Sequence, residues 1–387
     1  MSAVYLEVEC LSLLDFSVKI RFMSLLQHTN MLKNTFQDKE NRINDSVKEK
    51  IFQEFRNDDH WFDPTTETYL IIFYCAVIFI GTFSNVIICF IVWKNNSLRK
   101  PRNIFIVNIA VCDIIMCTFC MPFSLVKLTM KNWHLGLFLC KVVPSLQNID
   151  IFVSTFTIVA IALDRYWAIV HASRNIHMRT VLYMLIFIWA LALFCCIPML
   201  LFHEVHTVYS ETINKEDFQI CMEVWPSENL KIVYTLFVTV VQYLMPLLIV
   251  SIIHSKICCV LRMRVTKDPI TDNEMQRALR DVKRHRRNML LLTAIAITFG
   301  ITWLPWTVLN ITADINVEMF LHKKFLLIYA ICLLIAMSSA CANPVLYGWF
   351  NLNFRDAFTN SLIFWRKDST DSQEMVTYNK TSNERKS

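Results

Sequence analysis

Hydrophobic residues along the chain are gathered into seven long blocks that are separated by polar links. Each block contains about 20 residues or more, which is enough for a helix to cross the ~30 Å hydrocarbon core of a bilayer. A segment in lipid must satisfy its own backbone hydrogen bonds, so a helix is the expected form of each block. The blocks cover about 69–93, 104–126, 138–163, 181–202, 232–261, 289–311 and 325–350. The pattern predicts an all-α membrane protein, a seven-transmembrane helix bundle.

The overall composition supports this fold class. Hydrophobic residues make up 55% of the 387-residue chain, and its mean hydropathy is +0.41. A soluble domain seldom averages as high, because it must also build a polar surface. We therefore expect an amino-terminal tail over 1–68, the bundle over 69–350, a short inner-surface segment over 351–364 and a polar tail over 365–387.

Charged residues are distributed unequally between the links. The link after the first block, KNNSLRKPR, and the link after the fifth block are strongly basic, whereas the fourth link is rich in Glu and Asp. Positive residues concentrate on the cytoplasmic side of membrane proteins. The amino terminus is thus expected outside the cell and the carboxyl terminus inside. This orientation makes Asn44, in Asn44-Asp45-Ser46, a usable glycosylation site.

Most of the 14 cysteines fall within the blocks, where cysteine is an ordinary small packing residue. Cys140, where the third block begins, and Cys221, in the fourth link, are instead at outer positions. The outside of a cell is oxidising, so we expect a disulfide between them. It would tie the acidic fourth link to the third helix.

Several polar side chains interrupt the apolar blocks near their middle. Asp113 lies in the second block, and Asn85, Ser154, Ser339 and Asn343 lie in the first, third and seventh blocks. An ionisable residue in hydrocarbon is costly and therefore a functional candidate. These side chains could hold a small cation such as sodium, or they could simply form hydrogen bonds between helices. The sequence leaves both possibilities open.

The third block ends in an acid, a base and an aromatic residue, Asp164-Arg165-Tyr166. Because the block starts outside near Cys140, this triplet is expected at the cytoplasmic face. Gln147 lies 18 residues before Arg165, which is about 27 Å along a helix and places it near the outer mouth. Taken alone, the triplet fits a topological anchor at the membrane interface.

Prolines occur in several blocks and are expected to kink their helices. Trp303 lies two residues before Pro305, so a large ring stands beside one such hinge. Kinked helices open cavities, which suits receptors and transporters alike.

Further motifs occur in order along the chain, nearly one in each block. They are Asn85, NIAVCD ending at Asp113, Trp133, Cys140, Asp164-Arg165-Tyr166, Trp189, Pro246, Trp303-Leu304-Pro305 and Asn343-Pro344-Val345-Leu346-Tyr347. Over about residues 70 to 360, the series resembles the rhodopsin-like (class A) G-protein-coupled receptors. The resemblance implies a plasma-membrane receptor that acts on heterotrimeric G proteins and arrestin.

The resemblance also implies roles for individual residues. Asp164 would hold Arg165 at rest, beside Tyr166, and release it toward the G protein on activation. Trp303 would lie beneath the ligand pocket, with Pro305 as its hinge. The seventh-helix switch would comprise Asn343, Pro344 and Tyr347, and 351–364 would form a short amphipathic eighth helix on the inner surface.

Two positions depart from the family pattern. His254 stands in the fifth block where these receptors often have a tyrosine that contacts the triplet arginine. His285 precedes the sixth block where some members carry an acid that would pair with it. The resting state of this chain is therefore expected to be held less tightly.

Three stretches resemble the neuropeptide Y and neuropeptide F receptor group: NWHLGLFLCKVVPSLQNIDIFVSTFTIVAIALDRYWAIV, CMEVWPSENLKIVYTLFVTVVQYLMP and TWLPWTVLNITAD. In that group, the ligands are peptides with an amidated carboxyl end and an arginine one residue before the last. The resemblance implies that Asp314 accepts this arginine and that Gln147, assisted by Ser124, binds the terminal amide. Glu223 would be a secondary acid, and Trp303 would close the pocket from below.

Other functions fit the sequence less well. Amine receptors carry an aspartate where Gln147 stands, and visual opsins a lysine where Met337 stands. A receptor for another small ligand or peptide class is an alternative, and so is a transporter, although internal repeats and paired broken helices are lacking. No enzyme motif is found, and the basic KRHRRN segment, Lys283 to Asn288, indicates a membrane-side anchor rather than a nucleic-acid site.

Overall fold

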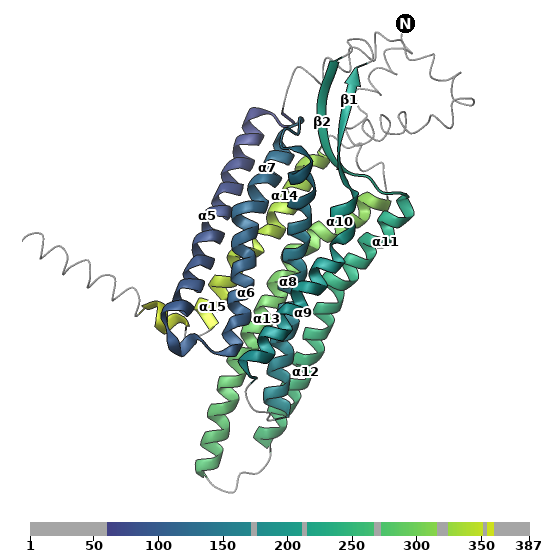
Figure 1. Cartoon of the computed structure of the whole chain (residues 1–387). Coiled ribbons are helices and arrows are strands. Elements are labelled where there is room, and N and C mark those ends of the chain that lie inside the picture. The colour runs from purple at the N-terminus through teal and green to yellow at the C-terminus, as the bar shows by residue number, and fades with distance from the viewer. Residues whose placement is uncertain are drawn as a thin grey trace, which may run out of the picture.

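A computed structural model describes residues 60–171, 176–210, 215–266, 272–315, 324–350 and 354–359. In this part of the chain, seven helical segments are long and apolar enough to cross a membrane, as the hydrophobic pattern predicts. They lie side by side as one elongated bundle (Figure 1). Asn44 and the tail over 365–387 lie outside the described residues.

Several of the spans consist of more than one element. Spans one to four are α5 (Pro64–Lys94), α6 with η3 and α7 (Pro101–Ile115, Met116–Cys120, Met121–Thr129), α8 (Gly136–Val170), and α9 with α10 (Met178–Cys195, Ile197–Phe202). Spans five to seven are α11 with η4 and α12 (Glu228–Val238, Thr239–Leu244, Met245–Thr266), α13 (Asp272–Ile315), and α14 with α15 (Phe325–Met337, Ser339–Phe350). A short 3-10 turn, η2 (Asn96–Leu98), links the first two spans.

Helix ends are set by local signals rather than by the limits of the apolar blocks. The first helix begins at Pro64, before the predicted start at residue 69, because Asp63 caps it by accepting a hydrogen bond from the Thr66 backbone N–H at 3.0 Å. This hydrogen bond lowers the pKa of Asp63. α13 likewise begins at Asp272, well before the apolar block that starts at residue 289. Hydropathy thus locates the membrane core, and at Pro64 a cap extends the helix beyond it.

Pro122, Pro198 and Pro246 coincide with breaks in the regular geometry of their helices, whereas Pro305 and Pro344 do not. The π-helical segments η3 and η4 end directly before Met121-Pro122 and Met245-Pro246. The fourth span is interrupted at Cys196 before Pro198, whereas Pro305 lies within α13. A proline removes one backbone hydrogen bond, and a wider turn accommodates its ring.

The fourth link forms an antiparallel hairpin of β1 (His203–Ser210) and β2 (Lys215–Glu223), which the sequence analysis did not predict. The register pairs His203 with Glu223 and Val205 with Cys221. The predicted disulfide is confirmed: Cys140 on α8 is bonded to Cys221, with their Cα atoms 5.6 Å apart. Both cysteines are buried beside Trp133. The disulfide therefore fixes β2 over one end of the bundle, which we call the hairpin end (Figure 1).

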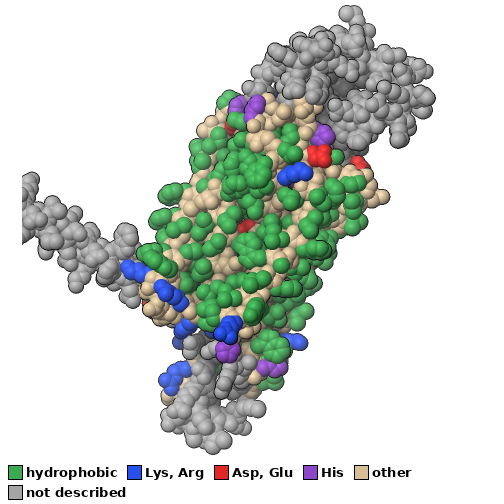
Figure 2. All heavy atoms as spheres, viewed as in Figure 1, with side chains coloured by type: hydrophobic (Ala, Val, Ile, Leu, Met, Phe, Trp, Pro, Cys, Tyr) green, Lys and Arg blue, Asp and Glu red, His purple; other side chains and the backbone are tan. Residues whose placement is uncertain are grey.

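The outer flank of the bundle is apolar, and most large side chains that face it are exposed. Phe79, Phe138 and Phe187 are examples, and Figure 2 shows such side chains covering most of the flank between charged ends. An apolar surface of this extent marks contact with lipid. Residues 354–359, from the predicted eighth helix, are helical. Phe354 anchors them, because its buried ring lies 6.3 Å from that of Tyr347.

Candidate functional site

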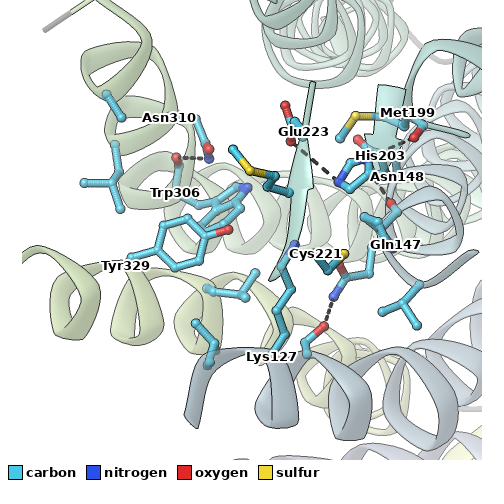
Figure 3. A pocket seen from close by; sticks show the side chains of 18 of the residues that line it. Lys127, Gln147, Asn148, Met199, His203, Cys221, Glu223, Trp306, Asn310 and Tyr329 are labelled. Atoms are coloured by element: carbon cyan, nitrogen blue, oxygen red, sulfur yellow. Dashed lines mark hydrogen bonds and ion pairs between the residues drawn. The ribbon is translucent and has the colours of Figure 1, made fainter. Parts of the chain in front are cut away.

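A cavity of about 920 Å³ opens at the hairpin end of the bundle. Its wall combines residues of α7, α8, α11, α13 and α14 with the end of β2. Figure 3 shows side chains of α7, α8, α13, α14 and β2 lying around one space. Ligand sites typically have volumes of about 300–1,000 Å³, apolar walls and a few placed polar groups. This cavity has that character and is large enough for the end of a peptide.

Gln147 and Ser124, which the sequence analysis assigned to the ligand, lie together in this cavity. The Gln147 side-chain amide donates a hydrogen bond to the Ser124 hydroxyl at 2.6 Å, joining α8 to α7 (Figure 3). Trp303 also lines the cavity, and its indole N–H donates to the Ser339 hydroxyl at 3.2 Å. The predicted amide site and the predicted ring beneath it are therefore parts of one cavity.

Asp314 lies on the α13 side of the same cavity, but its carboxylate is neither solvated nor unpaired. Its side chain is only 8% exposed. Lys231 on α11 places its ammonium 2.7 Å from Asp314 Oδ1, and the Thr235 hydroxyl donates to Oδ2 at 2.6 Å. The burial and these two partners distinguish Asp314 from an ordinary solvated acid at a helix end.

Glu223, the expected secondary acid, is held from several sides at the end of β2. Trp225 donates its indole N–H to Glu223 at 2.9 Å, and His203 Nε2 lies 3.8 Å from Glu223 Oε1 (Figure 3). Burial tends to raise the pKa of Glu223, but the interaction with His203 and the positive charge of Lys231 outweigh it, so the pKa lies below its usual value. The carboxylate thus stays ionised in the cavity.

His203 is a buried cavity residue that sequence reasoning missed. Its exposed fraction is 1%, and its Nδ1 lies 2.8 Å from the Met199 carbonyl oxygen, so Nδ1 carries a proton and donates. Burial lowers the pKa of His203, although Glu223 opposes the shift. Lys127, also missed, reaches the same space from α7 (Figure 3). The signal for Lys127 was its spacing of one helical turn from Ser124.

A second, smaller cavity of about 30 Å³ lies below Trp303 among the polar residues of the mid-bundle. The structure brings Asp113, Ser154, Ser339 and Asn343 to its wall, and the Asn343 amide donates to Asp113 Oδ2 at 3.0 Å. Asn85 is elsewhere engaged, because its amide donates to the Ala340 and Gly81 carbonyl oxygens at 2.9 Å each. Four of the five predicted polar residues therefore line the small cavity, and Asn85 does not.

Asp150 lines this small cavity as a second acid that the sequence analysis did not single out. Its side chain is buried, and within the described part of the chain its Oδ1 has no hydrogen-bond partner. The hydroxyl oxygen of Ser154 is in the same situation. Because Asp150 and Ser154 are one helical turn apart on α8, both face the cavity from the same side of that helix.

At the opposite end of the bundle, Asp164 is buried and forms an ion pair with a residue of another helix. The Arg102 Nε, on α6, donates to Asp164 Oδ2 at 3.2 Å. The Asp164 side chain is 6% exposed and that of Arg102 is 32% exposed. The pairing of Asp164 with Arg165 stays a prediction. The side chain of His285 lies outside the described residues.

Comparisons with known proteins agree with this architecture. The family model of the 7 transmembrane receptor (rhodopsin family) matches residues 84–347. The neuropeptide F receptor of Drosophila melanogaster is 38% identical over 301 residues, which cover 76% of this chain and 62% of that protein. The human neuropeptide Y receptor type 2 is 33% identical over 319 residues, which cover 81% of each chain.

The chain thus spans less than two thirds of the Drosophila receptor's length but most of the human receptor's. The matched family consists of receptors and not of enzymes, and its seven spans identify a multi-pass protein of the plasma membrane. The chain belongs to the rhodopsin family of seven-transmembrane receptors.

Proposed function

We propose that this protein is a receptor for an amidated neuropeptide with an arginine one residue before its last residue, and that it signals through heterotrimeric G proteins. The observation that carries the proposal is the buried carboxylate of Asp314 in the wall of a peptide-sized cavity. The names of the similar proteins, receptors for neuropeptides F and Y, support the ligand class.

The cavity offers a separate group for each feature of such a peptide. The planar guanidinium of arginine can meet the Asp314 carboxylate with two parallel hydrogen bonds. Gln147 offers both a donor and an acceptor to the terminal amide, with Ser124 beside it. Glu223 is the secondary acid, and Trp303 forms the base of the cavity.

Ligand binding would reach the opposite end of the bundle through a two-state rearrangement of the helices. Trp303 joins the two cavities, and Pro305 provides a hinge in α13. The switch residues below them are Asn343, Pro344 and Tyr347, followed by Asp164, Arg165 and Tyr166. In this proposal the hairpin end is extracellular, the flank contacts the lipid bilayer, and the G protein and arrestin bind at the opposite end.

A sodium ion in the small cavity is a further part of the proposal. Asp113, Ser154, Ser339 and Asn343 line that cavity, and Asp150 adds a second carboxylate. The residues fit a cation, because among the described residues no hydrogen-bond donor reaches the buried oxygens Asp150 Oδ1 and Ser154 Oγ, and hard cations prefer oxygen ligands. The ion would neutralise carboxylates that lipid and protein otherwise surround.

The test of the ligand class is a double-mutant cycle between Asp314 and the peptide arginine. Truncating one partner of a desolvated charge pair costs about 2–5 kcal/mol. Asp314→Asn should therefore weaken binding of the arginine peptide by about 30-fold or more and barely affect a peptide with alanine at that place. Glu228→Gln, at an exposed acid on the rim of the cavity, is the matched control. If the two losses are simply additive, Asp314 does not bind the arginine.

A further inference from the structure

Asp314 and Lys231 connect two helices across the wall of the large cavity. Lys231 and Thr235 are four residues apart on α11, so they face the same side of that helix. Each of them engages a different oxygen of Asp314: the ammonium lies 2.7 Å from Oδ1, and the hydroxyl donates to Oδ2. Both carboxylate oxygens therefore have a donor before any ligand arrives.

The burial of the two partners is unequal. Asp314 is 8% exposed, whereas Lys231 is 26% exposed and also lines the cavity. A carboxylate buried to this degree needs a counter-ion, and Lys231 provides it. The lysine, on its flexible stem, has open space beside it into which its head can move.

We propose that Lys231 is an internal competitor for the ligand's cation, and that it makes the receptor selective for arginine over lysine. This inference rests on the proposed function of Asp314 as the arginine site. An incoming cation must either displace the Lys231 ammonium or bind beside it against a like charge, and both oppose binding. When a ligand guanidinium replaces the Lys231 ammonium on Asp314, the interaction becomes stronger. The guanidinium can donate to both carboxylate oxygens at once, whereas an ammonium is a point charge.

A ligand lysine would gain nothing from that exchange, since it replaces one ammonium by another. The charge of Lys231 also acts on Glu223, whose pKa it helps to lower. Removing the charge would thus leave the cavity more negative near both acids. Lys231 therefore sets the affinity and the specificity with which the receptor binds its ligand. It has this effect only on ligands that carry a cation at this position.

The experiment uses Lys231→Met in the full-length receptor in membranes, because methionine keeps most of the stem and removes the charge. The probe is a short synthetic peptide that ends in arginine followed by an amidated tyrosine, with matched versions carrying lysine or alanine in place of the arginine. We expect affinity for the arginine peptide to rise about tenfold and affinity for the lysine peptide to rise by a larger factor, so that the preference for arginine over lysine falls; an equal rise for both peptides would show that Lys231 does not set this preference. The affinity for the alanine peptide should change less than about twofold.

Lys231→Arg is the conservative control, because it keeps a cation on Asp314 and should not raise the affinity. Lys256→Met controls for net charge, since Lys256 is exposed on α12 and lines neither cavity. Cell-surface immunodetection shows whether each variant folds, and Lys231→Gln replaces Lys231→Met if the latter does not reach the surface.

Two results would overturn the inference in distinguishable ways. If the charge-removing variant leaves the affinity for the arginine peptide unchanged or lowers it, while Asp314→Asn still weakens binding, Lys231 is a structural partner and not a competitor. If Asp314→Asn changes binding of neither the arginine nor the alanine peptide, the proposed function of Asp314 is wrong, and the role of Lys231 falls with it.

Discussion

Loss of the Cys140–Cys221 disulfide should destabilise the receptor and weaken ligand binding together. The bond closes a loop between residues separated by 81 positions. In the chain-entropy account, a loop of this size limits the unfolded chain by ~4 kcal/mol, and measured losses on removing a native disulfide are ~2–5 kcal/mol. Helices that stay in the membrane restrain the loop already, so we expect a loss of about 2–4 kcal/mol for Cys140→Ser.

This loss corresponds to a fall in melting temperature of about 2–5 °C for a chain of this size. Ligand affinity should fall too, because Cys221 fixes the end of β2, and Glu223 lies two residues farther along that strand. The assay is thermal unfolding of the purified receptor combined with competition binding of the arginine peptide. Cys75→Ser, at an exposed cysteine outside the disulfide, is the matched control and should melt like the wild type.

The double variant Cys140→Ser/Cys221→Ser separates the bond from the individual side chains. Both single changes break the same bond, so the double variant should be no less stable than the worse single variant. Losses that add in the double variant would show that the cysteines contribute independently. Labelling of both thiols in the folded wild-type receptor would refute the reasoning outright.

Two further predictions concern the ends of the bundle. Arg102→Gln should lower ligand-independent nucleotide exchange about threefold, because without Arg102 the Asp164 carboxylate is free to hold Arg165 more firmly. Unchanged exchange in this variant would contradict the idea that Arg102 and Arg165 compete for Asp164. Arg165→Ala should bind the peptide without activating the G protein. Burial holds the pKa of His203 below 6.5, the value expected in the unfolded chain. As the pH falls, the unfolded chain is therefore protonated at His203 before the folded receptor is. The stability that the neutral, buried His203 contributes is complete above pH 6.5 and declines as the pH falls toward the folded-state pKa. Between about pH 7.5 and 5.5, the wild type should lose about 1–2 °C in melting temperature that His203→Gln retains, and parallel curves for the two proteins would exclude His203 as the cause.

The hydrophobic pattern was sufficient to predict the fold class and the spans. Lipid leaves a spanning segment few options besides the helix, so the positions of the spans follow from length and polarity. The hairpin of β1 and β2 was not predictable in the same way. A short two-stranded sheet depends on its surroundings, and here Cys221 and the backbone of Val224, which donates to the Phe202 carbonyl oxygen at 2.7 Å, attach it to the bundle.

Site residues that belong to a sequence motif were predictable, whereas residues identified only by their contacts in the fold were not. Gln147, Ser124 and Asp314 line one cavity as expected. Lys231 lies 83 positions before Asp314 in the chain, so only the packing of α11 against α13 shows that they pair. Asp150 was missed for a related reason: an acid at one turn from Ser154 on α8 becomes notable only when both face the same small cavity.

An acid that binds a ligand's cation must meet two opposing requirements. It must be shielded from water, because attraction between charges weakens where solvent screens them, yet a shielded carboxylate without a counter-ion is costly when no ligand is bound. Glu228, exposed at the rim, is stable without a ligand because water solvates it, but it is not shielded. Asp314 meets both because Lys231 and Thr235 satisfy it in the free receptor. The affinity that an arginine ligand gains is then the difference between two ion pairs, and the internal lysine is what makes a buried binding acid compatible with a stable empty receptor.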